Sequence, residues 1–155
     1  MSAANQDIRA VLIQTEASRL LLPNATISEV LSYAEPEPMA DAPDWLLGQI
    51  RWRGWRLPLV AFAQLTGQGI EHGGLGSKVV VLKSLGGEAS LPFFALLTKG
   101  FPRLVSVSRD ALVAGDAGES GLATGVRAHV QLNDETVLIP DIDGIERAIL
   151  QATAA

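Results

Sequence analysis

The residue types that could do chemistry are few and scattered along this chain. There are two histidines and no cysteine, which excludes disulfides, thiolate metal sites and a cysteine nucleophile. His72 lies in a glycine-rich stretch, and His129 falls on the polar side of an alternating segment. Neither has a second histidine at ligand spacing, so the sequence predicts no metal site and no cofactor.

Two further patterns resemble catalytic or nucleotide-binding motifs without completing them. Residues 67–76 contain five glycines, but the Gly-Lys-Ser/Thr ending of a phosphate loop is absent and no amphipathic helix is expected to follow. A linker explains this stretch better. Asp141 and Asp143 lie where a helix is expected to start, and capping explains them without catalysis. The chain contains no Gly-x-Ser-x-Gly elbow, so a hydrolase would need a site near His129 assembled only in space.

Arginine and tryptophan gather in residues 45–62, which read WLLGQIRWRGWRLPLVAF. The basic and aromatic residues at the centre of this segment are Arg51, Trp52, Arg53, Trp55 and Arg56. Such alternation can stack single-stranded nucleic acid, and both types are also enriched at protein interfaces. Tryptophans at period two also fill cores. The formal net charge of −5 opposes binding to a phosphate backbone, so no nucleic acid partner is expected.

Composition sets the class of protein. A chain of 155 residues with 48% hydrophobic and 19% charged residues is enough for one domain with a sizeable core. The polar N-terminus lacks the basic-then-apolar order of a signal peptide. The apolar runs are all shorter than the roughly 20 residues that span a bilayer. We therefore expect a cytoplasmic protein without direct membrane insertion.

The elements that must position these residues are mostly strands, because the dominant period is two. The predicted strands are residues 10–13, 20–22, 50–52, 55–60, 78–82, 92–98, 104–107, 126–132 and 136–139. Pro58 donates no ladder hydrogen bond, so we expect it at a sheet edge or a bulge. Residues 26–29 have the spacing of a capping box, and a short helix, a turn or a strand over 27–33 are alternatives there.

The C-terminal segment changes to helical spacing. Its apolar stripe consists of Ile142, Ile145, Ile149 and Leu150. Asp141 or Asp143 can cap this helix, and Glu146 stands three residues after Asp143. Many short strands and a single closing helix favour small β-barrels over an α/β fold.

The order of these features resembles the CheW-like family of chemotaxis adaptors over roughly residues 8–150. The matching motifs are Leu22-Pro23, Ile27-Ser28-Glu29-Val30, residues 33–38, Ala42-Pro43, Leu47-Gly48, Arg53-Gly54, Leu57-Pro58-Leu59-Val60, residues 93–100 and residues 136–150. The tryptophan-rich form of the central hairpin is most similar to the ChpC-like branch. That branch is associated with chemosensory systems that control type IV pili and twitching motility.

The resemblance implies a mainly β fold in which two five-stranded SH3-like barrels intertwine within a single domain, residues 7–152, and a C-terminal helix closes it. It implies a non-catalytic adaptor that couples chemoreceptors to a CheA-type histidine kinase. The alternative function is that of a small β-barrel that binds a small ligand or single-stranded nucleic acid. The cytoplasmic tip of a methyl-accepting chemoreceptor would enter the groove between the barrels. The regulatory domain of the kinase would meet the first barrel. Such a protein would be cytoplasmic and recruited to polar receptor arrays.

The resemblance also implies which residues contact partners. By position, the kinase- and receptor-binding residues are Ile27, Glu29, Gly48, Arg53 and Gly54, and further interface candidates are Trp52, Trp55 and Arg56. Arg53 has an alternative role in bracing the hairpin by hydrogen bonding. The chain departs from the family pattern at Ala61, Ala95 and Thr98-Lys99. These departures suit an accessory adaptor with altered partners.

Overall fold

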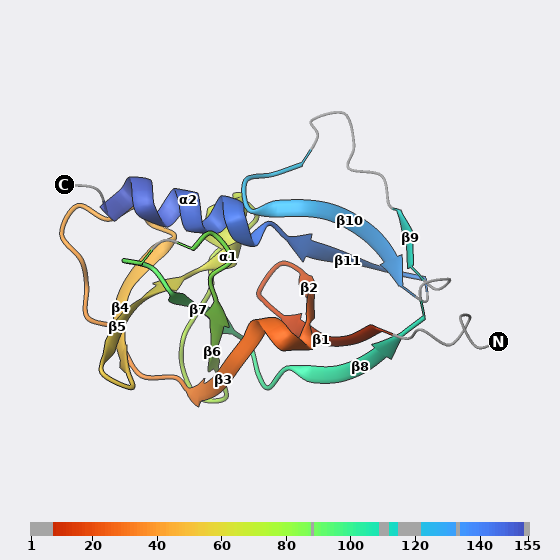
Figure 1. Ribbon diagram of the computed structural model, residues 1–155, viewed down its shortest axis with the longest axis horizontal. Helices are drawn as coiled ribbons and strands as arrows, with labels where there is room; N and C mark the ends of the chain where they lie inside the picture. The colour runs from red at the N-terminus through yellow and green to blue at the C-terminus, as the bar shows by residue number, and fades with distance from the viewer. Residues whose placement is uncertain (1–7, 88, 109–111, 115–121, 133, 154–155) are drawn as a thin grey trace.

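The computed structural model describes residues 8–87, 89–108, 112–114, 122–132 and 134–153, so residue 7, the expected start of the domain, lies outside it. Its strands form two sheets that lie next to each other, with a C-terminal helix above them (Figure 1). The strands are β1 (Ile8–Gln14), β2 (Arg19–Pro23), β3 (Ile27–Ser32), β4 (Leu46–Trp52), β5 (Trp55–Val60), β6 (Lys78–Lys83), β7 (Phe93–Thr98), β8 (Arg103–Val107), β9 (Leu112–Ala114), β10 (Val126–Leu132) and β11 (Glu135–Pro140). The helical elements are the 3₁₀ turn η2 (Asn24–Thr26), α1 (Phe62–Thr66) and α2 (Ile142–Thr153).

One sheet is built from consecutive strands of the chain, and the other combines strands from its two ends. One sheet has the order β3-β6-β7-β5-β4, and the other has the order β8-β1-β2-β11-β10-β9. The N-terminal hairpin β1–β2 therefore belongs with the C-terminal strands, joined to them by a parallel contact between β2 and β11. The predicted mainly β fold of two sheets with a closing helix is confirmed, and the three-residue β9 adds a sixth strand to one sheet.

One hydrophobic cluster connects both sheets and α2. It includes Ile13 and Leu20 of the six-stranded sheet, Val80 of the five-stranded sheet and Ile145 of α2, each fully buried. Burying such a side chain contributes about 1.5–3 kcal/mol. Smaller clusters lie within each sheet. The halves are therefore not independent units, because their largest core is shared.

The predicted strands pair as the antiparallel hairpins β1–β2, β4–β5 and β10–β11, and residues 27–32 take the strand alternative, as β3. The edge position expected for Pro58 is wrong, because β5 lies between β4 and β7. Pro58 stands opposite Gln49, whose backbone N–H and C=O are bonded to Glu37 instead. The Gln49–Pro58 pair is therefore a non-hydrogen-bonded one, and β4 needs no N–H from this proline. The ladder irregularity lies between Leu46 and Gly48.

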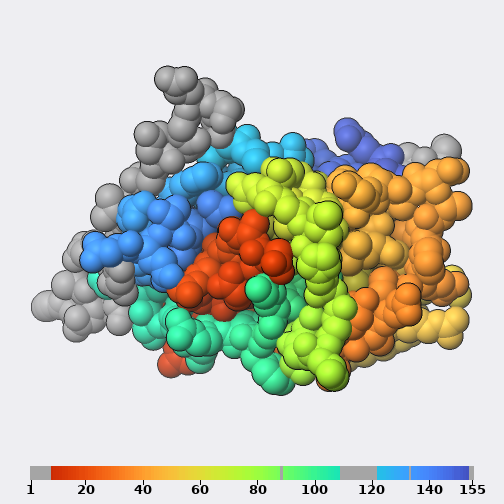
Figure 2. All heavy atoms as spheres, turned by 180° about the vertical axis from the view of Figure 1, so that it is seen from behind, coloured from red at the N-terminus to blue at the C-terminus, as the bar shows by residue number. Residues whose placement is uncertain are grey.

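The linker expected over residues 67–76 is a loop fastened by a buried glutamate. Glu71 is 6% exposed, and its carboxylate accepts the backbone N–H groups of Glu16 and Ala63, each at 2.9 Å. Figure 2 shows this segment, in yellow-green, running beside the red β1–β2 region along the boundary between the two halves. Burial raises the pKa of Glu71, and the two hydrogen bonds oppose that rise. The loop thus ties the start of α1 to the turn between β1 and β2.

A second buried glutamate fastens the C-terminal helix. Asp141 caps α2 by accepting the N–H of Gly144 at 3.1 Å, as one of the two predicted caps. Glu146 takes no part in that cap. It is 3% exposed and accepts the N–H groups of Leu85 and Gly86 at 2.7 and 2.9 Å. These contacts join α2 to the turn that follows β6.

Candidate partner-binding site

The hairpin β4–β5 ends in a two-residue turn that its sequence dictates. Arg53 has φ +48° and Gly54 has φ +81°, and positive φ at both positions is typical of a type I′ turn. This turn matches the twist of the flanking strands and places Trp52 opposite Trp55. Glycine adopts such a φ without strain, whereas arginine at this position needs compensating contacts.

Glu29 supplies those contacts from the far edge of the same sheet. One carboxylate oxygen, Oε1, accepts the indole N–H of Trp52 at 3.0 Å and Nη2 of Arg53 at 2.9 Å. The Arg53 guanidinium also lies 5.1 Å from the centroid of the Trp52 ring. Because β3 and β4 are opposite edge strands, this cluster shows that the sheet curls until side chains of its two edges touch, although the two edge strands do not pair. Arg53 therefore does brace the hairpin, and its side chain is also largely exposed.

The tryptophans of the hairpin have different roles. Trp52 is 8% exposed, and its ring meets Phe93 edge-to-face with centroids 4.9 Å apart. Trp55 is 45% exposed, and the centroid of its ring lies 6.4 Å from that of the same Phe93. We expected Trp52 as a candidate for a partner interface. The structure instead places it in the core, where its buried ring supports the site and offers little surface to a partner. Trp55 and Arg56 remain exposed.

Gly48 acts through a close approach of the backbone. Its φ is +146°, and a Cβ built on it would lie 2.3 Å from the carbonyl oxygen of Glu37. Glu37 and Gln49 exchange two backbone hydrogen bonds of 2.9 and 2.8 Å. Residues 34–37, here called the strap, are thereby held across the edge of β4. Only glycine fits at position 48 beneath this strap.

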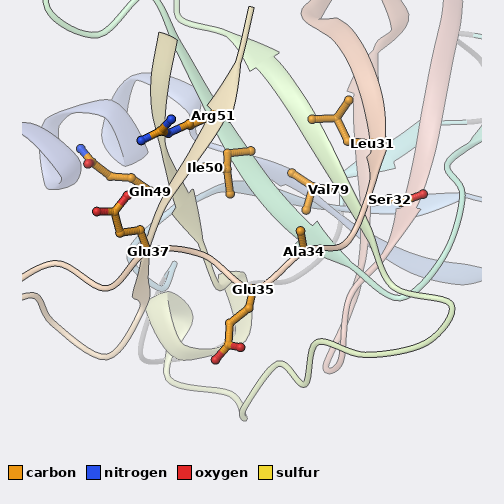
Figure 3. Close-up of a pocket in the computed structure, with 9 residues that line it drawn as sticks. All are labelled: Leu31, Ser32, Ala34, Glu35, Glu37, Gln49, Ile50, Arg51 and Val79. Carbon is orange, nitrogen blue, oxygen red and sulfur yellow. The ribbon is translucent and has the colours of Figure 1, made fainter. Parts of the chain in front are cut away.

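A pocket of about 370 Å³ opens between the strap and the edge strands (Figure 3). Its apolar part is formed by Leu31, Ala34, Ile50 and Val79, and its polar part by Ser32, Glu35, Glu37, Gln49 and Arg51. The carboxylate of Glu35 points away from the centre, whereas Glu37, Gln49 and Arg51 lie together on the β4 side. The combination of an apolar floor and a charged rim is typical of a protein contact surface.

The structure brings some predicted site residues together and separates others. Glu29, Arg53 and Gly54 meet at the hairpin end, and Gly48 lies farther along β4 beside the strap. Ile27 is partly buried and packs against the core shared by the two sheets, opposite Leu82. Ile27 therefore contributes to the junction between the two sheets and not to the cluster of Glu29, Trp52 and Arg53.

Three contributors were not predicted from sequence. Phe93 supports both tryptophans, Glu37 bridges to β4, and Glu71 fastens the loop over residues 67–77. The alternation of glutamate and proline over residues 35–38 indicated extended structure, which is the only signal that pointed toward the strap. An isolated glutamate in a glycine-rich stretch carried no signal of burial.

The departures from the family pattern have structural roles here. Ala61 is fully buried, and its N–H donates to the carbonyl of Trp45 at 2.7 Å. Thr98 is 1% exposed and donates its hydroxyl to Gly100 O at 2.8 Å. Lys99 lies 3.7 Å from a carboxylate oxygen of Glu16. Ala95 is also fully buried, on the central strand β7.

The histidines are separated. His72 is exposed in the loop over residues 67–77, and His129 is half-buried on β10. Among the described residues, no three His, Cys, Asp or Glu side chains gather closely enough to hold a metal ion.

Asp141 and Asp143 form ion pairs with Arg127, with oxygen-to-nitrogen distances of 3.1 and 3.9 Å. In the part of the chain that the structure describes, no helix is long and apolar enough to cross a membrane.

Comparisons with known proteins agree with this architecture. The chain matches the CheW-like domain over residues 9–149. Its fold is similar to the crystal structure of the scaffolding protein TtCheW from Thermoanaerobacter tengcongensis, with a TM-score of 0.73 at 14% sequence identity. That similarity covers 88% of this chain and 86% of the other. A comparison with curated proteins found no match. Because the family match covers nearly the whole chain, the protein belongs to the CheW-like domain family.

Proposed function

We propose that this protein is a non-catalytic adaptor that couples chemoreceptors to a CheA-type histidine kinase. Membership of the CheW-like family supports a scaffold role, as does the printed description of TtCheW as a scaffolding protein. The proposed partners are the regulatory domain of the kinase and the cytoplasmic tip of a methyl-accepting chemoreceptor. The proposed functional unit is the single domain over residues 7–152.

The observation that carries the proposal is the Glu29 cluster at the hairpin end. A carboxylate, an indole N–H and a guanidinium are fixed together at a surface position, with side-chain exposures of 36% for Glu29 and 71% for Arg53. Charges held in a set geometry give specificity to an interface formed mainly by shape and apolar contact. The nearby strap pocket and the exposed Trp55 supply apolar surface for such a contact.

The proposed context is a chemosensory system of type IV pili and twitching motility. It is supported by the tryptophan-rich hairpin, which resembles the ChpC-like branch. In this setting the protein is cytoplasmic and joins polar receptor arrays through its partners. The buried Ala61, and Lys99 in its pair with Glu16, stand where the family favours other residues, which favours an accessory adaptor.

Calorimetric titration with the regulatory domain of a CheA-type kinase from the same genome tests the proposal. We expect saturable one-to-one binding that Glu29→Lys or Arg53→Glu weakens by about tenfold or more, as for an interfacial charge pair. The matched control is Glu135→Lys, which breaks the exposed Glu135–Arg19 pair on the other sheet and should leave binding unchanged. Normal binding by both folded hairpin variants would overturn this site assignment. If the folded wild-type chain does not bind at all, the kinase is not its partner.

A further inference from the structure

The outer face of the hairpin end carries two arginines directly opposite each other. Arg51 of β4 pairs in register with Arg56 of β5, and both are exposed. Strand alternation places them on the face opposite Trp52 and Trp55, which turn toward Phe93. Like charges directly opposite each other on a strand pair are destabilising. The fold does not need this pair, so another reason for it must be sought.

The geometry of the ladder brings these two side chains especially close. Gln49 directs its backbone N–H and C=O to Glu37 and away from β5. Arg51, two residues later on the same strand, directs its backbone groups to the same outer edge. The Arg51–Arg56 pair is therefore a non-hydrogen-bonded pair, the arrangement with the shortest separation between opposite side chains.

Neither guanidinium has an anionic partner within the described residues. Arg19, Arg53 and Arg127 each pair with a carboxylate, whereas Arg51 and Arg56 form no ion pair there. The chain as a whole carries a formal charge of −5, so the sign of this arginine pair is opposite to the net charge of the chain. A hollow of about 400 Å³ surrounds the hairpin end and is lined by residues 51–56.

The edge of β4 shows how a ligand chain could lie here. β4 is an edge strand, and the strap already adds to it as an extended segment through one residue pair, Glu37 with Gln49. Beyond Gln49 the outward backbone groups of Arg51 continue the same edge. In Figure 3, Arg51 lies on the same side of the strap pocket as Gln49 and Glu37, so strap and arginine share one surface.

We propose that an extended acidic segment of a partner protein adds to the edge of β4 at Arg51, next to the strap. Its backbone would bond to Arg51, and its carboxylates would engage the guanidinium groups of Arg51 and Arg56. Planar guanidinium groups bind carboxylates through two parallel hydrogen bonds, and strand addition supplies the backbone contacts. Such a ligand would relieve the like-charge pair. This inference rests on the proposed adaptor function and names the chemistry of its partner.

A protein segment fits this surface better than nucleic acid. Two free guanidinium groups neutralise few phosphates, while the net negative charge of the chain repels a polyanionic backbone. Strand addition also needs a peptide backbone with alternating donors and acceptors. Single-stranded DNA is therefore the competing ligand in the test.

The test measures fluorescence polarisation of a short labelled peptide in which glutamate alternates with serine, so that all carboxylates share one face of an extended chain. Two matched peptides replace glutamate with glutamine, or carry a methyl group on every backbone nitrogen, which removes the N–H donors that a strand edge needs and keeps the carboxylates. The variant is the double change Arg51→Gln with Arg56→Gln. Its control is Arg9→Gln with Arg103→Gln, which removes two exposed arginines from the six-stranded sheet.

We expect the acidic peptide to bind the wild type and the control, and to bind the double variant at least about tenfold more weakly, as when two charge-assisted bonds are lost. The glutamine peptide and the N-methylated peptide should bind the wild type at least as weakly as the acidic peptide binds the double variant. The thermal midpoint of the double variant should not fall, because a repulsive pair has been removed. Arg51→Lys with Arg56→Lys keeps the charge but loses the planar fork, and should give intermediate affinity.

Three results would overturn the inference. The first is equal loss of affinity in the control variant, which would show nonspecific attraction. The second is equal binding of the N-methylated peptide, which would exclude strand addition. The third is binding of single-stranded DNA in preference to the acidic peptide. The kinase titration separates this inference from the proposed function, because a chain that binds the kinase but not the peptide refutes the inference alone. A chain that binds the peptide but not the kinase refutes the assigned partner alone.

Discussion

The indole N–H of Trp52 donates to Oε1 of Glu29 at 3.0 Å, across the gap between the two edge strands of the five-stranded sheet. The same oxygen accepts Arg53 Nη2 at 2.9 Å. A residue expected to contact a partner is therefore also the acceptor for a buried tryptophan. Substitutions at Glu29 must be chosen to separate these two roles.

Glu29→Gln and Glu29→Leu should separate them. Glutamine keeps an oxygen for the Trp52 indole and loses an exposed ion pair, which contributes about 0–1 kcal/mol. Leucine leaves the indole N–H without its acceptor, which costs about 1–3 kcal/mol of folding stability. Urea unfolding followed by tryptophan fluorescence measures both. Equal stability of the two variants would show that the Trp52 contact contributes nothing.

Gly48→Ala should displace the strap. A Cβ at position 48 would lie 2.3 Å from Glu37 O, so the strap must move or β4 must bend. We expect a loss of about 1–3 kcal/mol, in the range for strain at a special backbone position. Gly100→Ala is the control, because a Cβ there meets nothing within 4 Å. The prediction fails if hydrogen exchange at the Gln49 amide is as slow in Gly48→Ala as in the wild type.

Glu71 should make stability depend on pH. Because burial raises its folded-state pKa above the ordinary 4.5, the folded state binds the proton more tightly than the unfolded state. The resulting stabilisation is complete below about pH 4.5 and is lost as the pH rises through the raised pKa. Glu71→Gln removes this titration. The stability of the wild type relative to Glu71→Gln should therefore decline from about pH 4.5 upward.

Denaturant titrations of both proteins across this pH range measure that difference. Glu29→Gln, which changes a half-exposed carboxyl, is the matched control and should follow the wild type. A constant difference between wild type and Glu71→Gln across the range would contradict the prediction. At any single pH, Glu71→Gln should also lose one of the two backbone contacts, since an amide nitrogen cannot accept an N–H.

Glu146→Gln should loosen the C-terminal helix. Its carboxylate accepts two backbone N–H groups, and glutamine can accept only one of them through its single amide oxygen. The expected cost is about 1–3 kcal/mol, with faster hydrogen exchange at Leu85 and Gly86. Arg147→Gln, one residue along α2, is a suitable control. Unchanged protection at both amides would show that the contact is incidental.

Much of the fold could be predicted because local patterns and tertiary packing agree. The alternation in residues 126–132 and the stripe through Ile142, Ile145 and Ile149 match β10 and the buried face of α2. The Arg53-Gly54 turn follows from the backbone freedom of glycine. Pro58 was wrongly predicted at a sheet edge. Whether its missing N–H disrupts the pairing with β4 depends on the bonding of Gln49 to Glu37, which the local sequence does not show.

The site was less predictable because it depends on the curl of a sheet. Glu29 and Arg53 could be named as candidates through the family motif, but their contact needs β3 and β4 to come within reach of each other's side chains. The burial of Glu71 and Glu146 likewise depends on distant backbone groups that need an acceptor. The Arg51–Arg56 pair needs only the register of one hairpin, and the sequence contained that register once the turn was recognised.

The most direct test of the adaptor function is co-sedimentation of the kinase regulatory domain with membranes that contain a chemoreceptor, in the presence and absence of this protein. We predict that the kinase domain sediments only when this protein is present, to a saturating level. Arg53→Glu, which leaves the Trp52 indole its Glu29 acceptor, should weaken this recruitment, whereas Glu135→Lys should not. Recruitment of the kinase domain to the same level without this protein, or its displacement from the membranes by this protein, would contradict the account.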